Sequence, residues 1–190
     1  MASPASDPLW FFTPVQIATT VIAGMNCGAS ALQSPLTWPM LQYVDVPIHY
    51  VGRQTENLLH GSEMIFPPFN GICTLANLVL SGFAYYNRDR TDTYASAKLP
   101  LTALAFGLHV ATTVYTLTIM APYNEKLKVA SRELNRGVDR VGKPGEEGTD
   151  GQKKSAEAFR DAQVRWKTLN YGRGIVMLSA AIANAMALKA

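Results

Sequence analysis

Charged residues are scarce in this chain and are missing altogether from three long stretches. Asp, Glu, Lys and Arg make up 16% of its 190 residues, below the share of roughly a quarter that is usual for soluble domains. Residues 9–32, 64–86 and 99–121 contain none of the four. Each stretch is long enough to cross about 30 Å of hydrocarbon at about 1.5 Å per residue. We therefore predict three membrane-spanning helices at these positions.

A fourth span is predicted at residues 171–189, although charges lie near both of its ends. Arg173 and Lys189 flank its apolar part, and long basic side chains can reach the lipid headgroups from such positions. The alternative is a buried helix of a soluble bundle. With the fourth span, residues 1–190 are expected to form one all-α domain, an integral membrane four-helix bundle.

The basic residues are unevenly distributed along the chain. Residues 122–171 hold eleven of the seventeen Lys and Arg, so the positive-inside tendency places this loop, and the loop at 33–63, in the cytosol. Helical patterns extend spans three and four into the cytosol, on either side of a Gly-rich stretch at about 142–154 that is predicted to be a flexible loop. Interleaved acidic residues and the lack of any groove-reading motif argue against a nucleic-acid partner. The expected location is the endoplasmic reticulum or another organelle membrane.

Prolines mark the predicted starts of two spans. Pro67 and Pro68 fall in the first turn of the second span and Pro100 in the first turn of the third, where a missing amide donor costs little. The preceding loop at 33–63 combines prolines with aromatic residues. It is therefore predicted to be an ordered cap at the membrane interface.

Motifs for metals and cofactors are missing as well. Cys27 and Cys73 are the only cysteines, lie within predicted spans and do not form a CxxC pair, so they are interpreted as small apolar residues. The sequence has no GxGxxG and no P-loop. The three histidines, His49, His60 and His109, could in principle ligate iron or copper.

Each predicted span carries polar residues on one helical face. Polar groups in hydrocarbon need partners, so the four faces are expected to converge inside the bundle. The faces comprise Gln16, Thr20, Ala23, Cys27 and Ser30; Asn70, Thr74, Asn77 and Ser81; Thr102, His109, Thr113, Thr116 and Met120; and Trp166, Asn170, Arg173, Met177, Ala180 and Asn184.

His109 and Arg173 are the costliest of these groups to bury, and they favour a ligand cavity that both of them border. The alternatives are a core histidine bonded to a facing Thr or Asn, and an arginine that reaches the cytosolic headgroups. Trp166 and Asn170 share the face of Arg173 and would help it to hold a planar anionic ligand by stacking and by the guanidinium fork. Asn124 is expected at the level of Asn170.

The motifs of the third and fourth spans resemble a known family. NEKL at residues 124–127, followed by Trp166, Asn170 and Arg173, resembles the four-span membrane family, first described as a domain of unknown function, that includes fungal anthrone oxygenases. GAS and SPL within residues 28–36 are similar to the small-residue segment of that family. The resemblance covers nearly the whole chain and implies the fold of four spans.

The resemblance also implies a reaction in secondary metabolism, the oxidation of an anthrone-like or other phenolic polyketide intermediate to a quinone. Loss of one proton from the methylene of an anthrone gives a delocalised anion that can react with dioxygen. On this hypothesis His109 is the general base, and Arg173, assisted by Asn170 and Asn124, stabilises the oxyanion. No cofactor is expected and dioxygen is the co-substrate. The alternative is haem or a metal ion held by the histidines.

The substrate-binding residues on this hypothesis are Trp166, Thr113, Thr116, Asn77 and Met177. The expected partners are an aromatic small molecule and the lipid bilayer, and a GxxxG surface at Gly24 and Gly28 suits a homo-oligomer. The competing hypothesis is a non-catalytic four-span subunit or scaffold of a membrane assembly, in which His109 packs against protein with no adjoining cavity. A transporter is a third alternative, which the lack of an inverted repeat disfavours.

Overall fold

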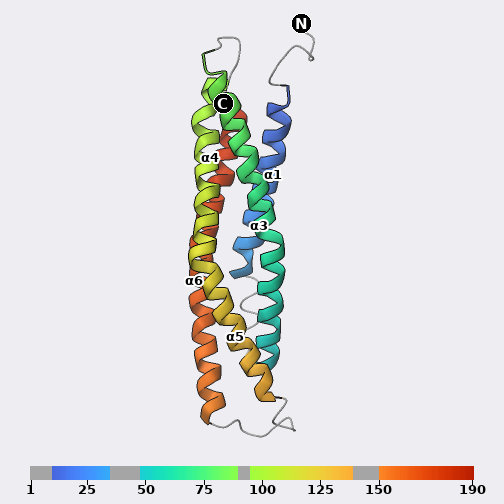
Figure 1. Cartoon of the computed structure of the whole chain (residues 1–190), viewed down its shortest axis with the longest axis vertical. Helices are drawn as coiled ribbons and strands as arrows, with labels where there is room; N and C mark the ends of the chain where they lie inside the picture. Colours follow the sequence, from blue (N-terminus) through green and yellow to red (C-terminus); the bar gives the residue numbers. More distant parts are fainter. Residues whose placement is uncertain (1–9, 35–47, 90–94, 139–149) are drawn as a thin grey trace. The chain divides into compact units, whose positions relative to one another are not determined.

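The structure is a computed structural model that describes residues 10–34, 48–89, 95–138 and 150–190, and these residues are almost entirely helical (Figure 1). In chain order the elements are α1 (Phe12–Leu32), α3 (Ile48–Tyr86), α4 (Ala95–Tyr115), the π-helical segment η3 (Thr116–Met120), α5 (Ala121–Val138) and α6 (Asp150–Lys189). No strand occurs within the described ranges. The prediction of an all-α fold is confirmed.

Among the described residues, four stretches of helix are long and apolar enough to cross a membrane. They are Phe12–Leu32, Tyr50–Tyr86, Ser96–Leu134 and Lys154–Lys189. Each contains one of the predicted spans, including the fourth span with its charged ends. The prediction of a multi-pass membrane protein with four spans is therefore confirmed, whereas its orientation and its organelle stay predictions.

The second span begins much earlier than predicted. α3 starts at Ile48, so Pro67 and Pro68 lie inside the helix and not in its first turn. The predicted cap at 33–63 is wrong from residue 48 onward, and residues 35–47 lie outside the described residues. Val51 and Leu59 are buried at helical spacing, and this packing supports a helix that the interior prolines disfavour.

The third span also begins earlier than predicted, because α4 starts at Ala95 and includes both Lys98 and Pro100. Pro100 therefore lies beyond the first turn. Lys98 is 5% exposed, and its Nζ donates to the carbonyl oxygens of Ala187 at 2.8 Å and Leu188 at 3.4 Å. These carbonyls belong to the last turn of α6, where intrahelical donors run out.

α4, η3 and α5 follow one another without a break, which agrees with the predicted helical extension of the third span. A π-helix bonds i to i+5 and widens the turn. Met120, at the end of η3, is buried as predicted, and Thr116 is partly buried. Thr113 precedes η3 and is exposed, whereas Thr112 is buried, so the predicted buried face is wrong at Thr113.

α6 is one continuous helix of 40 residues, as the uninterrupted pattern after residue 155 predicts. The predicted flexible loop at 142–154 is helical from Asp150 onward. Its remaining residues, 142–149, lie outside the described residues.

The chain divides into two compact units. Unit 1 comprises Met1–Ala29, Phe66–Val114 and Gly174–Ala190, and unit 2 comprises Ser30–Ile65 and Tyr115–Arg173. α1, α3 and α6 each contribute residues to both units. The two units differ in the polarity of their interiors and of their surfaces.

Unit 1 has polar side chains inside and large apolar side chains outside. Gln16, Asn77 and Asn184 are fully buried. Its exposed residues include Ile17, Val21, Met25, Leu75, Val79, Leu104, Ile175, Leu178 and Ile182. A soluble domain shows the reverse arrangement, whereas lipid solvates outward apolar side chains and forces polar groups to find partners inside. Unit 1 is therefore suited to the hydrocarbon of a bilayer.

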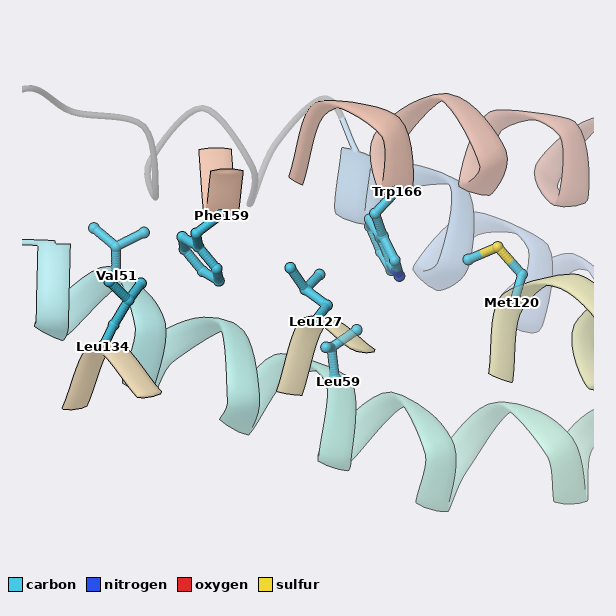
Figure 2. Packing of buried hydrophobic residues seen from close by; sticks show 7 residues of the cluster. All are labelled: Val51, Leu59, Met120, Leu127, Leu134, Phe159 and Trp166. Atoms are coloured by element: carbon cyan, nitrogen blue, oxygen red, sulfur yellow. The ribbon is translucent and has the colours of Figure 1, made fainter. Parts of the chain in front are cut away.

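Unit 2 has an apolar core cluster beside buried polar side chains and carries charge on its surface. Figure 2 shows its core cluster, which consists of Val51, Leu59, Met120, Leu127, Leu134, Phe159 and Trp166. Its exposed residues include Lys126, Arg132, Glu133, Arg160, Asp161 and Arg165. This pattern is typical of helices that pack in water. It supports the predicted helical extension outside the membrane, which here includes α3 as well as α5 and α6.

Replacing Leu59 with Ala should destabilise unit 2, because Leu59 is fully buried in this cluster. We expect a loss of about 2–5 kcal/mol in the free energy of unfolding, measured by denaturant unfolding of the detergent-solubilised chain. Val164→Ala is the matched control, since Val164 is 53% exposed and should cost less than about 0.5 kcal/mol. Equal effects of the two substitutions would contradict the assigned core.

Candidate functional site

His109 is buried in unit 1 and is held by Asn70 of α3. Its Nδ1 lies 2.8 Å from the Asn70 Oδ1 atom. The Asn70 Nδ2 atom donates to the His109 carbonyl oxygen at 3.0 Å and to Thr113 Oγ1 at 2.7 Å. Because both donor bonds come from Nδ2, the amide oxygen is the atom that faces the ring. An amide oxygen only accepts, so this hydrogen-bond pattern assigns the ring proton to Nδ1.

The other ring nitrogen of His109 is therefore the basic one. Nε2 lies 3.4 Å from the Nδ2 atom of Asn184 in α6. A neutral imidazole whose N–H is held by a side-chain acceptor presents its second nitrogen in a fixed direction, as a general base requires. Asn70 and Asn184 had no predicted role, and their only sequence signal was their place on the polar faces.

Two other predicted residues are buried in unit 1. Asn77 is fully buried, and its Nδ2 atom donates to the carbonyl oxygen of Cys73 one turn earlier at 2.9 Å. Met177 is 4% exposed. Of the predicted substrate-binding residues, Thr113 is the one that joins the hydrogen bonds around His109, through Asn70.

Arg173 and Asn170 form one hydrogen-bond network in unit 2. The Arg173 Nη2 atom donates to Ser30 Oγ and to Asn170 Oδ1, both at 2.6 Å. Asn170 Nδ2 donates to the Ser30 carbonyl oxygen at 3.0 Å and to Ser34 Oγ at 2.9 Å. Arg173 is 6% exposed, so its guanidinium points into the unit. This burial argues against the alternative in which it reaches the headgroups.

Tyr115 approaches the same part of α6 and was not predicted. Its hydroxyl donates to the carbonyl oxygen of Leu169 at 2.9 Å. A Cβ atom at Gly172 would lie 3.1 Å from this hydroxyl oxygen, which is closer than ordinary van der Waals contact. Glycine at position 172 therefore lets Tyr115 reach the α6 backbone.

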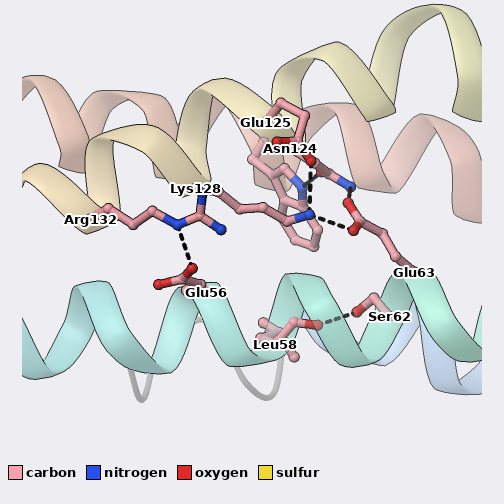
Figure 3. A network of polar contacts seen from close by, with 9 residues as sticks. Glu56, Leu58, Ser62, Glu63, Asn124, Glu125, Lys128 and Arg132 are labelled. Carbon is pink, nitrogen blue, oxygen red and sulfur yellow. Dashed lines mark hydrogen bonds and ion pairs between the residues drawn. The ribbon is translucent and has the colours of Figure 1, made fainter.

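Trp166 and Asn124 meet in unit 2. The indole Nε1 donates to Asn124 Oδ1 at 2.7 Å, and Asn124 Nδ2 donates to Glu63 Oε1 at 3.2 Å. Lys128 donates to Glu63 and, at 2.9 Å, to Glu125 (Figure 3). The indole is 1% exposed and belongs to the core cluster. Its predicted stacking on a ligand stays a prediction.

The predicted site residues are divided between the units. His109, Thr113, Asn77 and Met177 belong to unit 1, and Arg173, Asn170, Asn124, Trp166 and Thr116 belong to unit 2. A cavity that both His109 and Arg173 border stays a prediction. One pocket among the described residues, of about 300 Å³, is lined by Val79, Gly82, Phe83 and Tyr86 of α3. None of these four is a predicted site residue.

The histidines of the alternative metal site are also distributed over the chain. His109 is buried in unit 1, His60 is exposed in unit 2, and the side chain of His49 lies outside the described residues. Within the described ranges, no three His, Cys, Asp or Glu side chains come together as a metal site. The Cys27 and Cys73 thiols are buried and donate to the carbonyl oxygens of Gly174 and Thr19.

Comparison with known proteins identifies one family. The sequence model of the anthrone oxygenase family matches residues 56–183. No curated protein and no solved structure matches the chain. The matched range contains Asn70, His109 and Arg173, whereas Gln16 and Asn184 lie outside it.

The hydrogen bonds around His109 predict its tautomer. In the full-length chain labelled with ¹⁵N-histidine, the Nδ1 resonance of His109 should be that of a protonated nitrogen and Nε2 that of an unprotonated one. Asn70→Leu removes the acceptor and should shift His109 toward the mixture that free imidazole shows. Exposed His60 should be unaffected and serves as the internal reference. A proton on Nε2 in the unsubstituted chain would contradict the assignment.

Proposed function

Because the chain belongs to the anthrone oxygenase family, we propose that it is a membrane-embedded oxygenase that converts an anthrone-like or other phenolic polyketide intermediate to a quinone. Dioxygen is the co-substrate and no bound cofactor takes part. The observation that carries the proposal is the buried imidazole of His109, whose Nδ1 proton is held 2.8 Å from Asn70 Oδ1. Family membership supports an oxygenase, and we propose the roles of the individual residues.

The first step is removal of a proton from the substrate methylene. His109 Nε2 takes this proton and becomes an imidazolium, while the electron pair of the C–H bond spreads over the aryl rings and the ring carbonyl. The carbanion then gives electrons to dioxygen, and a C–O bond forms to give a peroxide anion. The imidazolium returns its proton to this anion, so the base is regenerated and a neutral hydroperoxide results.

The second step forms the quinone carbonyl. His109 removes the remaining hydrogen of the same carbon as a proton, the C–H electron pair becomes the C=O bond, and the O–O bond breaks. The leaving hydroxide takes the proton from the imidazolium and departs as water. One oxygen atom of dioxygen therefore enters the quinone and the other enters water, and the substrate supplies all four electrons.

The anion that forms in the first step needs stabilisation in a medium with little water. For this role we propose Arg173, because its guanidinium is buried and is oriented by Ser30 and by Asn170. A guanidinium stays protonated and can offer two parallel N–H donors to an enolate oxygen. Asn170 then acts as a positioning residue.

Replacing His109 with Gln should lower kcat/KM for 1,3,8-trihydroxyanthrone by about 10²-fold or more, because Gln cannot accept the proton. The measurement is dioxygen uptake by the detergent-purified chain above the uncatalysed rate, together with the absorbance of the quinone. A chelator control tests the metal alternative.

His60→Gln is the matched control for this experiment, since His60 is exposed on α3. The proposed mechanism predicts full activity for this variant, whereas a metal site that includes His60 predicts a loss. Full activity of His109→Gln would overturn the base assignment. No uptake by the unsubstituted chain with any anthrone would favour the non-catalytic subunit.

Arg173→Lys should lower kcat/KM by about 10²-fold, since the charge is kept but the planar fork is lost. Arg165→Lys is the matched control on the same helix, because Arg165 is exposed and should tolerate the change. Unchanged kinetics in Arg173→Lys would show that the guanidinium serves packing alone. Circular dichroism of both variants checks that α6 stays folded.

A further inference from the structure

Besides Asn26, three buried amide side chains of unit 1 have polar atoms that no described residue satisfies. The atoms are Gln16 Nε2, Asn77 Oδ1 and Asn184 Oδ1, and all three residues are 0% exposed. A buried donor or acceptor without a hydrogen bond is costly, and hydrocarbon around the unit supplies no water to relieve it. These atoms therefore indicate a binding site for a group from outside the described chain.

Gln16 and Asn77 lie at corresponding levels of α1 and α3 within unit 1. The rings of Phe11 and Phe83 lie 4.9 Å apart, and Cys73 Sγ lies 3.8 Å from the Thr19 carbonyl oxygen. From the first contact to the second, the residue number increases along α1 and decreases along α3. The two helices are therefore antiparallel here. Gln16 lies between the two α1 contacts, and the corresponding position on α3 is close to Asn77. Since both side chains are buried, they point toward the same part of the interior.

Asn184 connects the part of the interior near Gln16 and Asn77 with His109. Lys98 Nζ lies 3.5 Å from Gln16 Oε1 and 2.8 Å from the Ala187 carbonyl oxygen. Asn184 is three residues before Ala187, which is about one helical turn. In the other direction, Asn184 Nδ2 lies 3.4 Å from His109 Nε2. The amides of Gln16, Asn77 and Asn184 thus form a polar column that ends at the basic nitrogen of His109.

The chemistry of the three atoms selects the bound group. Two amide oxygens need donors and one amide nitrogen needs an acceptor. A hydroxyl group is both donor and acceptor, so one hydroxyl can satisfy the nitrogen and one of the two oxygens. We propose that Gln16, Asn77 and Asn184 form a hydroxyl-binding site that holds a phenolic hydroxyl of the aromatic substrate beside His109. This inference rests on the proposed function and names the substrate group that the same site recognises.

The position of that hydroxyl on the substrate follows from its hydrogen bonds. A phenol next to the ring carbonyl donates to that carbonyl within the molecule, so its proton is already engaged. A hydroxyl on the outer edge of a ring has its proton available for Asn77 or Asn184. Outer-edge hydroxyls are therefore the recognised group. Water offers the same donor and acceptor, and the experiment has to distinguish these two sources.

Asn26 provides the matched control for the site. It is 1% exposed, and neither polar atom of its amide has a partner among the described residues. It lies ten residues after Gln16 on α1, a distance of roughly 15 Å along the helix axis. Substituting Asn26 thus removes a buried amide from the same unit without touching the polar column.

The test measures binding of two unreactive quinones to the full-length chain in detergent by isothermal titration calorimetry. The probes are 2-hydroxyanthraquinone and 2-methoxyanthraquinone, which differ by the O–H donor. We expect the unsubstituted chain to bind the hydroxyl compound about tenfold more tightly. Asn77→Leu and Asn184→Leu should reduce this ratio to less than about twofold, and Asn26→Leu should preserve it. Comparing ratios cancels the partitioning of each quinone into detergent.

Three results would overturn the proposal. The first is equal binding of both quinones by the unsubstituted chain, and the second is a preserved ratio in Asn77→Leu and Asn184→Leu. The third is binding of neither quinone while both Leu variants raise Tm, which would assign the three amides to internal water alone. If a Leu variant does not purify as a folded helical chain, Asn77→Ala or Asn184→Ala replaces it with the same expectation.

The same experiments separate this inference from the proposed function. Hydroxyl-selective binding without dioxygen uptake on any anthrone would support the binding site and contradict the oxygenase. Dioxygen uptake that depends on His109, with equal binding of both quinones, would support the oxygenase and contradict the hydroxyl-binding site.

Discussion

The requirement that polar groups in hydrocarbon find hydrogen-bond partners within the protein determines most of this structure. In unit 1 it turns the polar face of each helix inward and leaves the large apolar side chains outside. It also accounts for the bond between Asn70 and His109, because each supplies what the other lacks. In unit 2 the charged surface allows an ordinary apolar core, and polar networks there orient particular side chains such as Trp166 and Arg173.

The four spans could be predicted because they depend on local composition. Long uncharged runs specify a membrane helix whatever its neighbours are, and a polar face identifies the side that points inward. The start of α3 could not be predicted in this way. Pro67 and Pro68 disfavour a continuous helix locally, and only the burial of residues such as Val51 and Leu59 against other helices explains why it continues. Packing across the unit outweighs the local preference.

The sequence predicts which helical face each residue of the candidate site lies on, but it does not predict the hydrogen-bond partner of that residue. The spacing of His109, Asn70 and Asn184 places each on an inward face, yet it says nothing about which amide atom meets which ring nitrogen. The π-helix at Thr116–Met120 has no recognised sequence signal. Thr113 was placed on the buried face although it is exposed, whereas α6 retained its phase from Trp166 to Asn184.

The amides around His109 suit the role of general base inside a membrane that we propose for it. A carboxylate partner would make the imidazole more basic, but it would leave a permanent charge in a region of low dielectric constant, where an unpaired charge is very costly. Asn70 fixes the tautomer without adding charge. In the proposed mechanism, proton transfer from a substrate creates the imidazolium and the organic anion together, next to each other. Opposite charges formed as a pair attract strongly in such surroundings, so the neutral resting site favours the transition state over the ground state.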